Sequence, residues 1–97
     1  MYKHVVCFKL KNPTPDRLRE TKSILLSMNG KVELLRGLSV GVDTLHSDRS
    51  FDIILEVLLD GPEDLPLYQN HPYHAGVVKK HMGEVSEKSI TVDYLVD

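Results

Sequence analysis

Three residues with reactive side chains, Tyr68, His71 and His74, follow one another at intervals of three positions. On an uninterrupted helix this spacing places side chains on adjoining turns. Pro72 breaks such a helix, because the residue before a proline avoids helical geometry, so we expect the three side chains to pack side by side at a turn. An imidazole that accepts a proton, beside a phenol that donates a hydrogen bond, has the chemistry to deprotonate a carbon next to a carbonyl group.

The helix that begins after this break favours a neutral His74, because the positive end of its dipole disfavours an imidazolium in the first turn. Tyr68 is then suited to donate a hydrogen bond to a carbonyl oxygen as that oxygen gains charge. Each residue also has a structural interpretation. His71 fits a helix cap whose ring accepts a backbone N–H, Tyr68 fits a core ring with a tethered hydroxyl, and His74 fits a second capping or packing histidine.

A fourth candidate, His4, is predicted to share one face of an N-terminal strand with Val6 and Phe8. An unpaired polar ring on such a face is costly, so His4 is either satisfied by a neighbour or open to a cavity. We favour the cavity. We therefore expect His4, His71, Val6 and Phe8 to form a substrate-binding wall around the reactive pair.

A metal site is an alternative use of His4, His71 and His74, with Asp93 as a further ligand. Two histidines three residues apart occur in metal sites, but the sequence offers no carboxylate at a defined spacing from them. The single cysteine, Cys7, excludes a zinc site built on several thiolates. We therefore expect neither a metal nor a cofactor.

Size and composition predict one domain spanning residues 1–97, with no room for a second core. The hydrophobic share of 41% and the charged share of 27% are those of a folded chain rather than a disordered one. The net charge is -2 and no basic run exceeds Lys79-Lys80, so nucleic acid is not an expected partner. No stretch approaches the roughly 20 apolar residues of a membrane span or resembles a signal peptide, and we expect a cytoplasmic protein. His46 and His81 are predicted to lie at the surface.

Alternation and helical spacing divide the chain into strands and helices that must position these side chains. Strands are expected over residues 2–10, 38–43, 51–59 and 87–96, helices over 15–28 and 72–84, and weaker helical turns over 31–36 and 63–69. The order β-α-β-β-α-β is that of a ferredoxin-like α+β domain, with a four-stranded antiparallel sheet and both helices on one face.

Both faces of this sheet are predicted to carry apolar residues. In the third strand Ile53 and Leu55 alternate with Ile54 and Leu58. Helices cover only one face, and leaving the other in water would expose a large apolar patch. A second copy of the chain would cover this face without requiring another protein. We therefore expect a homodimer formed through the sheet face with two-fold symmetry.

Five segments in order resemble the stress-responsive dimeric α/β-barrel (Dabb) family: residues 3–11, 37–43, 51–55, 67–74 and 92–94. The most specific is the fourth, in which a tyrosine precedes His71-Pro72-Tyr73-His74, similar to the family's His-Pro-x-His element. The resemblance implies a ferredoxin-like protomer whose sheet packs on a second sheet in a dimeric α/β barrel. It also implies that His74 corresponds to the base, and Tyr68 to its partner, in the family's polyketide cyclases, which close a linear polyketide by aldol condensation.

The resemblance has departures as well. The aromatic side chains that the cyclases' first helix sends into the pocket are replaced here by Thr21, Lys22 and Leu25, and polar Ser89 and Thr91 stand where those enzymes have apolar residues. Other members, from plants, resemble stress-associated proteins.

Two functional hypotheses follow from these residues. In the first, the protein is a cofactor-independent lyase or cyclase-like enzyme, in which His74 removes a proton next to a carbonyl of a small apolar, polyketide-like substrate and Tyr68 stabilises the enolate. In the second, it is a non-catalytic stress-responsive or ligand-binding dimer, which the altered pocket favours. Related dimeric barrels also host cofactor-free oxygenase chemistry.

Overall fold

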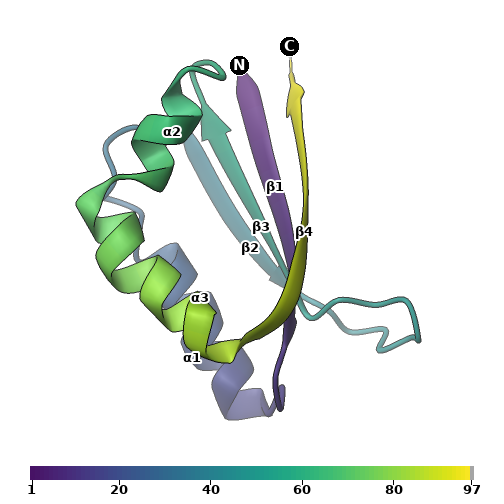
Figure 1. Cartoon of the computed structure of the whole chain (residues 1–97). Helices are drawn as coiled ribbons and strands as arrows, with labels where there is room; N and C mark the ends of the chain where they lie inside the picture. The colour runs from purple at the N-terminus through teal and green to yellow at the C-terminus, as the bar shows by residue number, and fades with distance from the viewer. Residues whose placement is uncertain (97) are drawn as a thin grey trace.

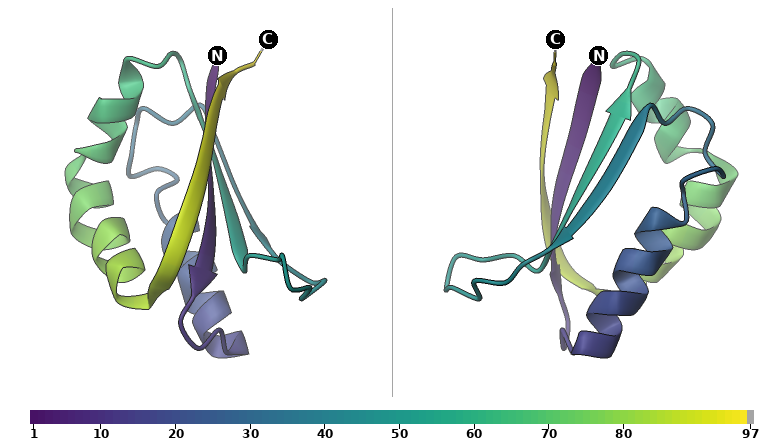
Figure 2. Two further views of the ribbon diagram at one scale, coloured as in Figure 1. Left: turned by 45° about the vertical axis from the view of Figure 1, so that its right-hand side comes forward. Right: turned by 180° about the vertical axis from the view of Figure 1, so that it is seen from behind.

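In the computed structural model, which describes residues 1–96, a four-stranded sheet carries the helices on one face (Figures 1 and 2). The elements follow in the order β1 (Tyr2–Leu10), α1 (Pro15–Leu26), β2 (Gly37–Val42), β3 (Ile53–Leu59), α2 (Asp64–Gln69), the π-helical turn η1 (His74–Val78), α3 (Lys79–Val85) and β4 (Ser86–Leu95). The predicted ferredoxin-like order is confirmed, with the second helical region divided into three pieces. None of the helices within the described residues is long and apolar enough to cross a membrane.

The sheet places β1 in its centre. The strand order is β2-β3-β1-β4, and every neighbouring pair is antiparallel. Because side chains alternate along a strand, His4 and Val6 of β1 face the helices, while Lys3 and Val5 face the other side. This position gives residues 2–8 of β1 a partner on both sides, so the register of two ladders fixes what surrounds His4.

The first helix begins where the sequence predicts. The hydroxyl of Thr14 accepts a hydrogen bond from the backbone N–H of Arg17 at 3.2 Å, and Pro15 occupies the first helical position, where a missing N–H costs nothing. Thr21 and Leu25 form the buried stripe of α1, and Met28 continues it in the turn that follows. These residues close one side of the core.

The core fills the space between the helices and the sheet. It is built from thirteen buried side chains: Val6, Leu10, Leu25, Met28, Val32, Ile53, Leu55, Val57, Leu59, Tyr68, Val78, Met82 and Val85. Every second residue of β3 belongs to it, which confirms the predicted alternation of that strand.

Some predicted boundaries differ from the structure. Residues 31–36 form turns rather than a helical turn, and Gly37 opens β2 instead of ending a helix. The backbone N–H of Arg36 already donates to the carbonyl of Leu58 at 2.8 Å, so pairing with β3 begins there and competes with a local helix. β3 begins at Ile53 rather than at residue 51, and β4 begins at Ser86 rather than at residue 87.

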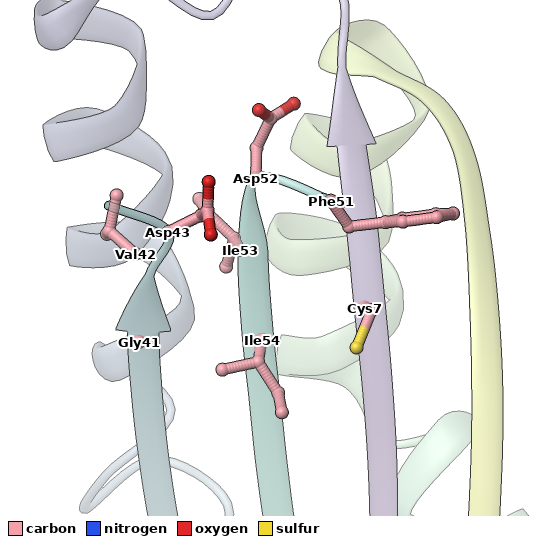
Figure 3. A pocket seen from close by; sticks show the side chains of 8 residues that line it. All are labelled: Cys7, Gly41, Val42, Asp43, Phe51, Asp52, Ile53 and Ile54. Atoms are coloured by element: carbon pink, nitrogen blue, oxygen red, sulfur yellow. The ribbon is translucent and has the colours of Figure 1, made fainter. Parts of the chain in front are cut away.

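The sheet's other face has no covering layer within residues 1–96 (Figure 2). Several apolar side chains lie open on it, including Ile54, Ile90, Val92 and Tyr94. A hollow of about 230 Å³ lies at one end of this face, and in Figure 3 the ring of Phe51 reaches across β1 towards β4 beside it. The predicted apolar character of both sheet faces is therefore present in the structure.

Replacing Leu25 with alanine should lower the free energy of unfolding by about 2–5 kcal/mol, the range for removing a leucine from a filled core. Leu25 is 0% exposed, whereas its neighbour Leu26 is 38% exposed. Leu26→Ala is therefore a matched control with the same change in helix propensity, and we expect it to cost less than about 1 kcal/mol. Chemical denaturation followed by circular dichroism, at one protein concentration, measures both. Equal losses would contradict this placement of the core.

Candidate functional site

A cavity of about 220 Å³ lies between the second helical region and the side of the sheet formed by β1, β3 and β4. Residues from all of these elements surround it: His4, Val6, Phe8, Leu55, Tyr68, Gln69, His74, Val78, Lys79, Met82 and Thr91. Aliphatic, aromatic and thioether side chains make up much of this wall, and the polar groups are few, as is usual for small-molecule sites.

Five of the residues singled out in the sequence meet at this cavity, namely His4, Val6, Phe8, Tyr68 and His74. The ring of Tyr68 contacts both imidazoles. Its centroid lies 4.6 Å from that of His74 and 6.0 Å from that of His4, the latter pair in an edge-to-face arrangement. The structure thus assembles one aromatic cluster from the first strand and the second helical region.

His74 is held in one orientation by the backbone. Its Nδ1 lies 3.1 Å from the carbonyl oxygen of Gln69. A carbonyl oxygen only accepts hydrogen bonds, so Nδ1 carries the proton, and in the neutral ring Nε2 keeps its lone pair. The ring therefore has one nitrogen fixed by the protein and one able to accept a proton.

The environment of His74 keeps this ring neutral. Burial lowers its pKa below the ordinary value of 6.5, and the charges of Lys79, His4 and His71 act in the same direction. The hydrogen bond to Gln69 opposes them by raising the pKa, but the net shift is downward. Burial disfavours the charged form of an imidazole because it removes water from the cation. The expected neutral base agrees with these effects.

His4 is paired with a carboxylate. It is buried, and its Nδ1 donates a hydrogen bond to Oδ1 of Asp93 at 2.5 Å. Asp93 is the residue of β4 directly opposite His4 in the β1–β4 ladder, so the register of the sheet creates the contact. Because a carboxylate oxygen accepts this hydrogen bond, Nδ1 of His4 carries a proton. Both sequence interpretations of His4 hold, because the ring is satisfied by a neighbour and also lines the cavity.

The hydroxyl of Tyr68 has a different partner from the one that the sequence suggests. The residue is completely buried, and its hydroxyl donates to the sulfur of Met28 at 3.7 Å. Burial raises the pKa of this phenol, so the hydroxyl stays protonated. In this conformation the ring of Tyr68 lines the cavity while the hydroxyl is engaged in the core.

His71 is not brought to the cavity. Its Nδ1 accepts the backbone N–H of Tyr73 at 3.1 Å, and its Nε2 lies 3.3 Å from a carboxylate oxygen of Glu33. The carbonyl of His71 accepts the N–H of Ala75 at 2.8 Å, which starts the helix after Pro72. These are the contacts of a helix cap, the structural interpretation of this residue.

The metal alternative is not supported by these positions. Among residues 1–96, no three histidine, cysteine or carboxylate side chains gather closely enough to hold a metal ion. His71 bonds to the backbone at the helix cap, whereas His4 bonds to Asp93 and His74 to a carbonyl.

His81 lies in the interior rather than at the predicted surface. Its Nε2 is 2.9 Å from Oγ1 of Thr21, and its Nδ1 is 3.6 Å from a carboxylate oxygen of Glu20, so it joins α1 to α3. This contact accounts for Thr21, which the resemblance marked as a departure. Thr21 pairs with His81 in the helix interface, and no described residue around the cavity comes from α1.

Sequence reasoning missed three contributors to the site. Asp93 was considered only for the metal alternative, although strand alternation already puts it on one face with Thr91, so pairing β4 with β1 would have found it. Gln69 acts through its backbone carbonyl, which residue identity does not reveal. Lys79 lines the cavity directly after a π-helical turn, which sequence periodicity does not signal.

Comparison with known proteins agrees with this architecture. The family model described as "Stress responsive A/B Barrel Domain" (Dabb) matches residues 2–96. A stress-response A/B barrel domain-containing protein of Arabidopsis thaliana is 30% identical over an alignment of 97 positions, which covers 97% of this chain. The chain spans only 36% of the length of that relative.

Solved structures share the fold as well. A dimeric ferredoxin-like protein of unknown function from Bacteroides fragilis superposes with a TM-score of 0.83 at 26% identity, covering 98% of this chain and 95% of that one. The hydroxynitrile lyase of Passiflora edulis superposes with a TM-score of 0.82 at 15% identity, covering 99% and 93%. At that identity the likeness concerns the fold alone. The match of the family model over nearly the whole chain shows that this protein belongs to the stress-responsive A/B barrel (Dabb) family.

Proposed function

We propose that the protein is a cofactor-independent enzyme of the lyase or cyclase type, which removes a proton from the carbon next to a carbonyl group. The observation that carries this proposal is the pair of oriented imidazoles on one cavity. His74 and His4 each have Nδ1 bound by a protein acceptor, Gln69 and Asp93 respectively, and both rings line the same small apolar space.

His74 is the base in this proposal. Its Nε2 takes the proton from the α-carbon, and the electron pair of the broken C–H bond moves into the enolate, so that the carbonyl oxygen becomes negative. His74 then holds the proton as an imidazolium and returns it to the product. A neutral imidazole of lowered pKa is free to act at neutral pH because it is not already protonated.

His4 is suited to stabilise the oxygen. Paired through Nδ1 with Asp93, its ring as an imidazolium donates from Nε2 to the developing oxyanion. We assign Tyr68 the role of holding the two imidazoles through its ring. Its hydroxyl would serve the oxyanion only after leaving the sulfur of Met28.

The fold is compatible with such chemistry. A hydroxynitrile lyase shares it, which supports a lyase built on this scaffold without assigning any residue. A second candidate function is a non-catalytic ligand-binding protein. The observation that favours it is the hydroxyl of Tyr68, which is occupied in the core and leaves one less donor for an oxyanion.

We also propose that the protein is a homodimer formed through the uncovered sheet face. Apolar side chains of β4 lie open on that face, and a long edge strand of this kind invites pairing or cover. The Bacteroides fragilis neighbour, which shares the fold, is a dimeric protein. Covering the face would also leave the cavity on the opposite side of the sheet open to ligands.

His74→Ala should lower enzyme-dependent exchange of α-protons at least about a hundredfold, because loss of a positioned base typically costs 10²–10⁴-fold. The assay follows deuterium incorporation by ¹H NMR in D₂O, over a panel of small ketones, β-keto acids and other 1,3-dicarbonyl compounds. His46→Asn is the matched control, since His46 lies in an exposed loop with a positive φ that asparagine tolerates. Equal exchange with wild type and His74→Ala would exclude this base, and absence of exchange in wild type would favour the binding function.

The pH dependence should carry the signature of a neutral base. The pKa of His74 is lowered from 6.5, so the ring is neutral above that lowered pKa and protonated below it. We expect the acid limb of kcat/KM, over which His74 becomes protonated, to lie below pH 6.5. An acid limb centred above pH 6.5 would contradict His74 as the group that titrates.

Val92→Glu should convert the dimer to a monomer without unfolding the protomer. Val92 is 62% exposed on the uncovered sheet face, so a carboxylate there costs the isolated protomer little but is buried uncompensated in a dimer. Leu67→Glu is the control, because Leu67 is 58% exposed but lies on α2, away from that face. Sedimentation equilibrium measures both variants. A monomeric wild type, or dimers in both variants, would contradict this interface.

A further inference from the structure

The cavity is small, and its size limits what it can bind. The cavity has a volume of about 220 Å³. This is below the range of about 300–1,000 Å³ that is usual for drug-sized ligands. A long polyketide chain would extend far outside it, whereas a short carbonyl compound would be enclosed.

The charge around the cavity is positive. Lys79 is the lysine among the described lining residues, and two imidazoles lie on the same wall. The carboxylate of Asp93, which contacts one of these rings, is already used by Nδ1 of His4. The site therefore offers a cation to a ligand and no free anion in its described wall.

A π-helical turn connects His74, the proposed base, to Lys79. The backbone N–H of Lys79 donates to the carbonyl of His74, five residues earlier, which is the π-helical pattern. In a regular α-helix that carbonyl would bond to Val78, the residue four positions on. The turn therefore contains one additional residue, and both Val78 and Lys79 line the cavity with His74.

We propose that the cavity selects small carboxylates that carry a ketone close to the acid group, such as β-keto acids, with Lys79 binding the carboxylate and His74 facing the carbon between the two groups. The inference rests on the proposed function for its reaction, because a β-keto acid presents an acidic C–H between a ketone and a carboxylate. The apolar wall, including Val6, Phe8 and Met82, accommodates the short carbon chain.

The electrostatic environment of the base fits an anionic ligand. The charge of Lys79 is one of the causes that lower the pKa of His74. A bound carboxylate would offset the positive charge of Lys79 and would favour protonation of His74 as it accepts a proton. Among the other groups that line the cavity, Tyr68 stays protonated and Gln69 is neutral, so no titratable acid there competes for Lys79.

Acetoacetate and acetoacetamide form a matched pair of probes, because they have the same number of non-hydrogen atoms and differ in charge. Titration of the ¹⁵N-labelled full chain with each probe, followed by NMR shifts of His74 and its neighbours, measures binding without any turnover. We expect wild type to bind acetoacetate about fivefold or more tightly than acetoacetamide, a preference of the size that a partly exposed charge pair supplies.

Lys79→Gln should abolish this preference, whereas Lys80→Gln should retain it. Lys80 is the adjacent exposed lysine of α3 and does not line the cavity, so it controls for net charge and helix propensity. The preference in wild type should also weaken at high salt. Equal binding of the two probes, no binding of either, or equal losses in both lysine variants would overturn the inference. Lys79-dependent binding of acetoacetate without exchange of its α-protons would support this inference while contradicting the proposed enzyme.

Discussion

The antiparallel ladder between β1 and β4 is the interaction on which the site depends. It places Asp93 directly opposite His4 on the face of the sheet that the helices cover. A slip of one residue in this register would turn Asp93 to the open face, and the buried imidazole of His4 would lose its carboxylate. Burying an unpaired polar ring costs about 1–3 kcal/mol, so the pair of His4 and Asp93 stabilises this register of the sheet. The same pair orients the imidazole of His4 at the cavity.

The two faces of the same sheet differ in their surroundings, because one contacts the helices and the other carries exposed apolar side chains. On the helix side, His4 and Val6 alternate with neighbours that point away, and they meet a helical layer that leaves a small cavity. On the other side, Val5 and Cys7 join the exposed apolar residues of β4. A cover on that second face would stabilise the sheet through burial of apolar area without entering the cavity. In the proposed dimer, assembly and ligand binding would therefore be separated by the thickness of one sheet.

Alternation along strands and the break at Pro72 were sufficient to predict the element order, the helix-facing position of His4 and the meeting of Tyr68 with His74. These features depend on local periodicity, which can be read directly from the sequence. Partners across the fold were harder to predict. His81 was assigned to the surface because nothing local reveals that Thr21 faces it across two helices, and the hydroxyl of Tyr68 turns to Met28 because of a core contact between residues far apart in the chain. The π-helical turn changes which backbone N–H donates to the carbonyl of His74, and helical spacing alone assigns that hydrogen bond to Val78.

The competing influences on His74 show how the fold sets the strength of a base. Burial removes water from the imidazolium and is the largest influence, and the nearby positive charges act with it, while the carbonyl of Gln69 opposes both. A base weakened in this way remains unprotonated at neutral pH but accepts a proton less readily than free imidazole. A ligand that brings negative charge into the cavity would reverse part of this loss only while it is bound. Positive surroundings would thus keep His74 neutral before binding, and the negative charge of the bound ligand would favour the proton on His74 during its transfer.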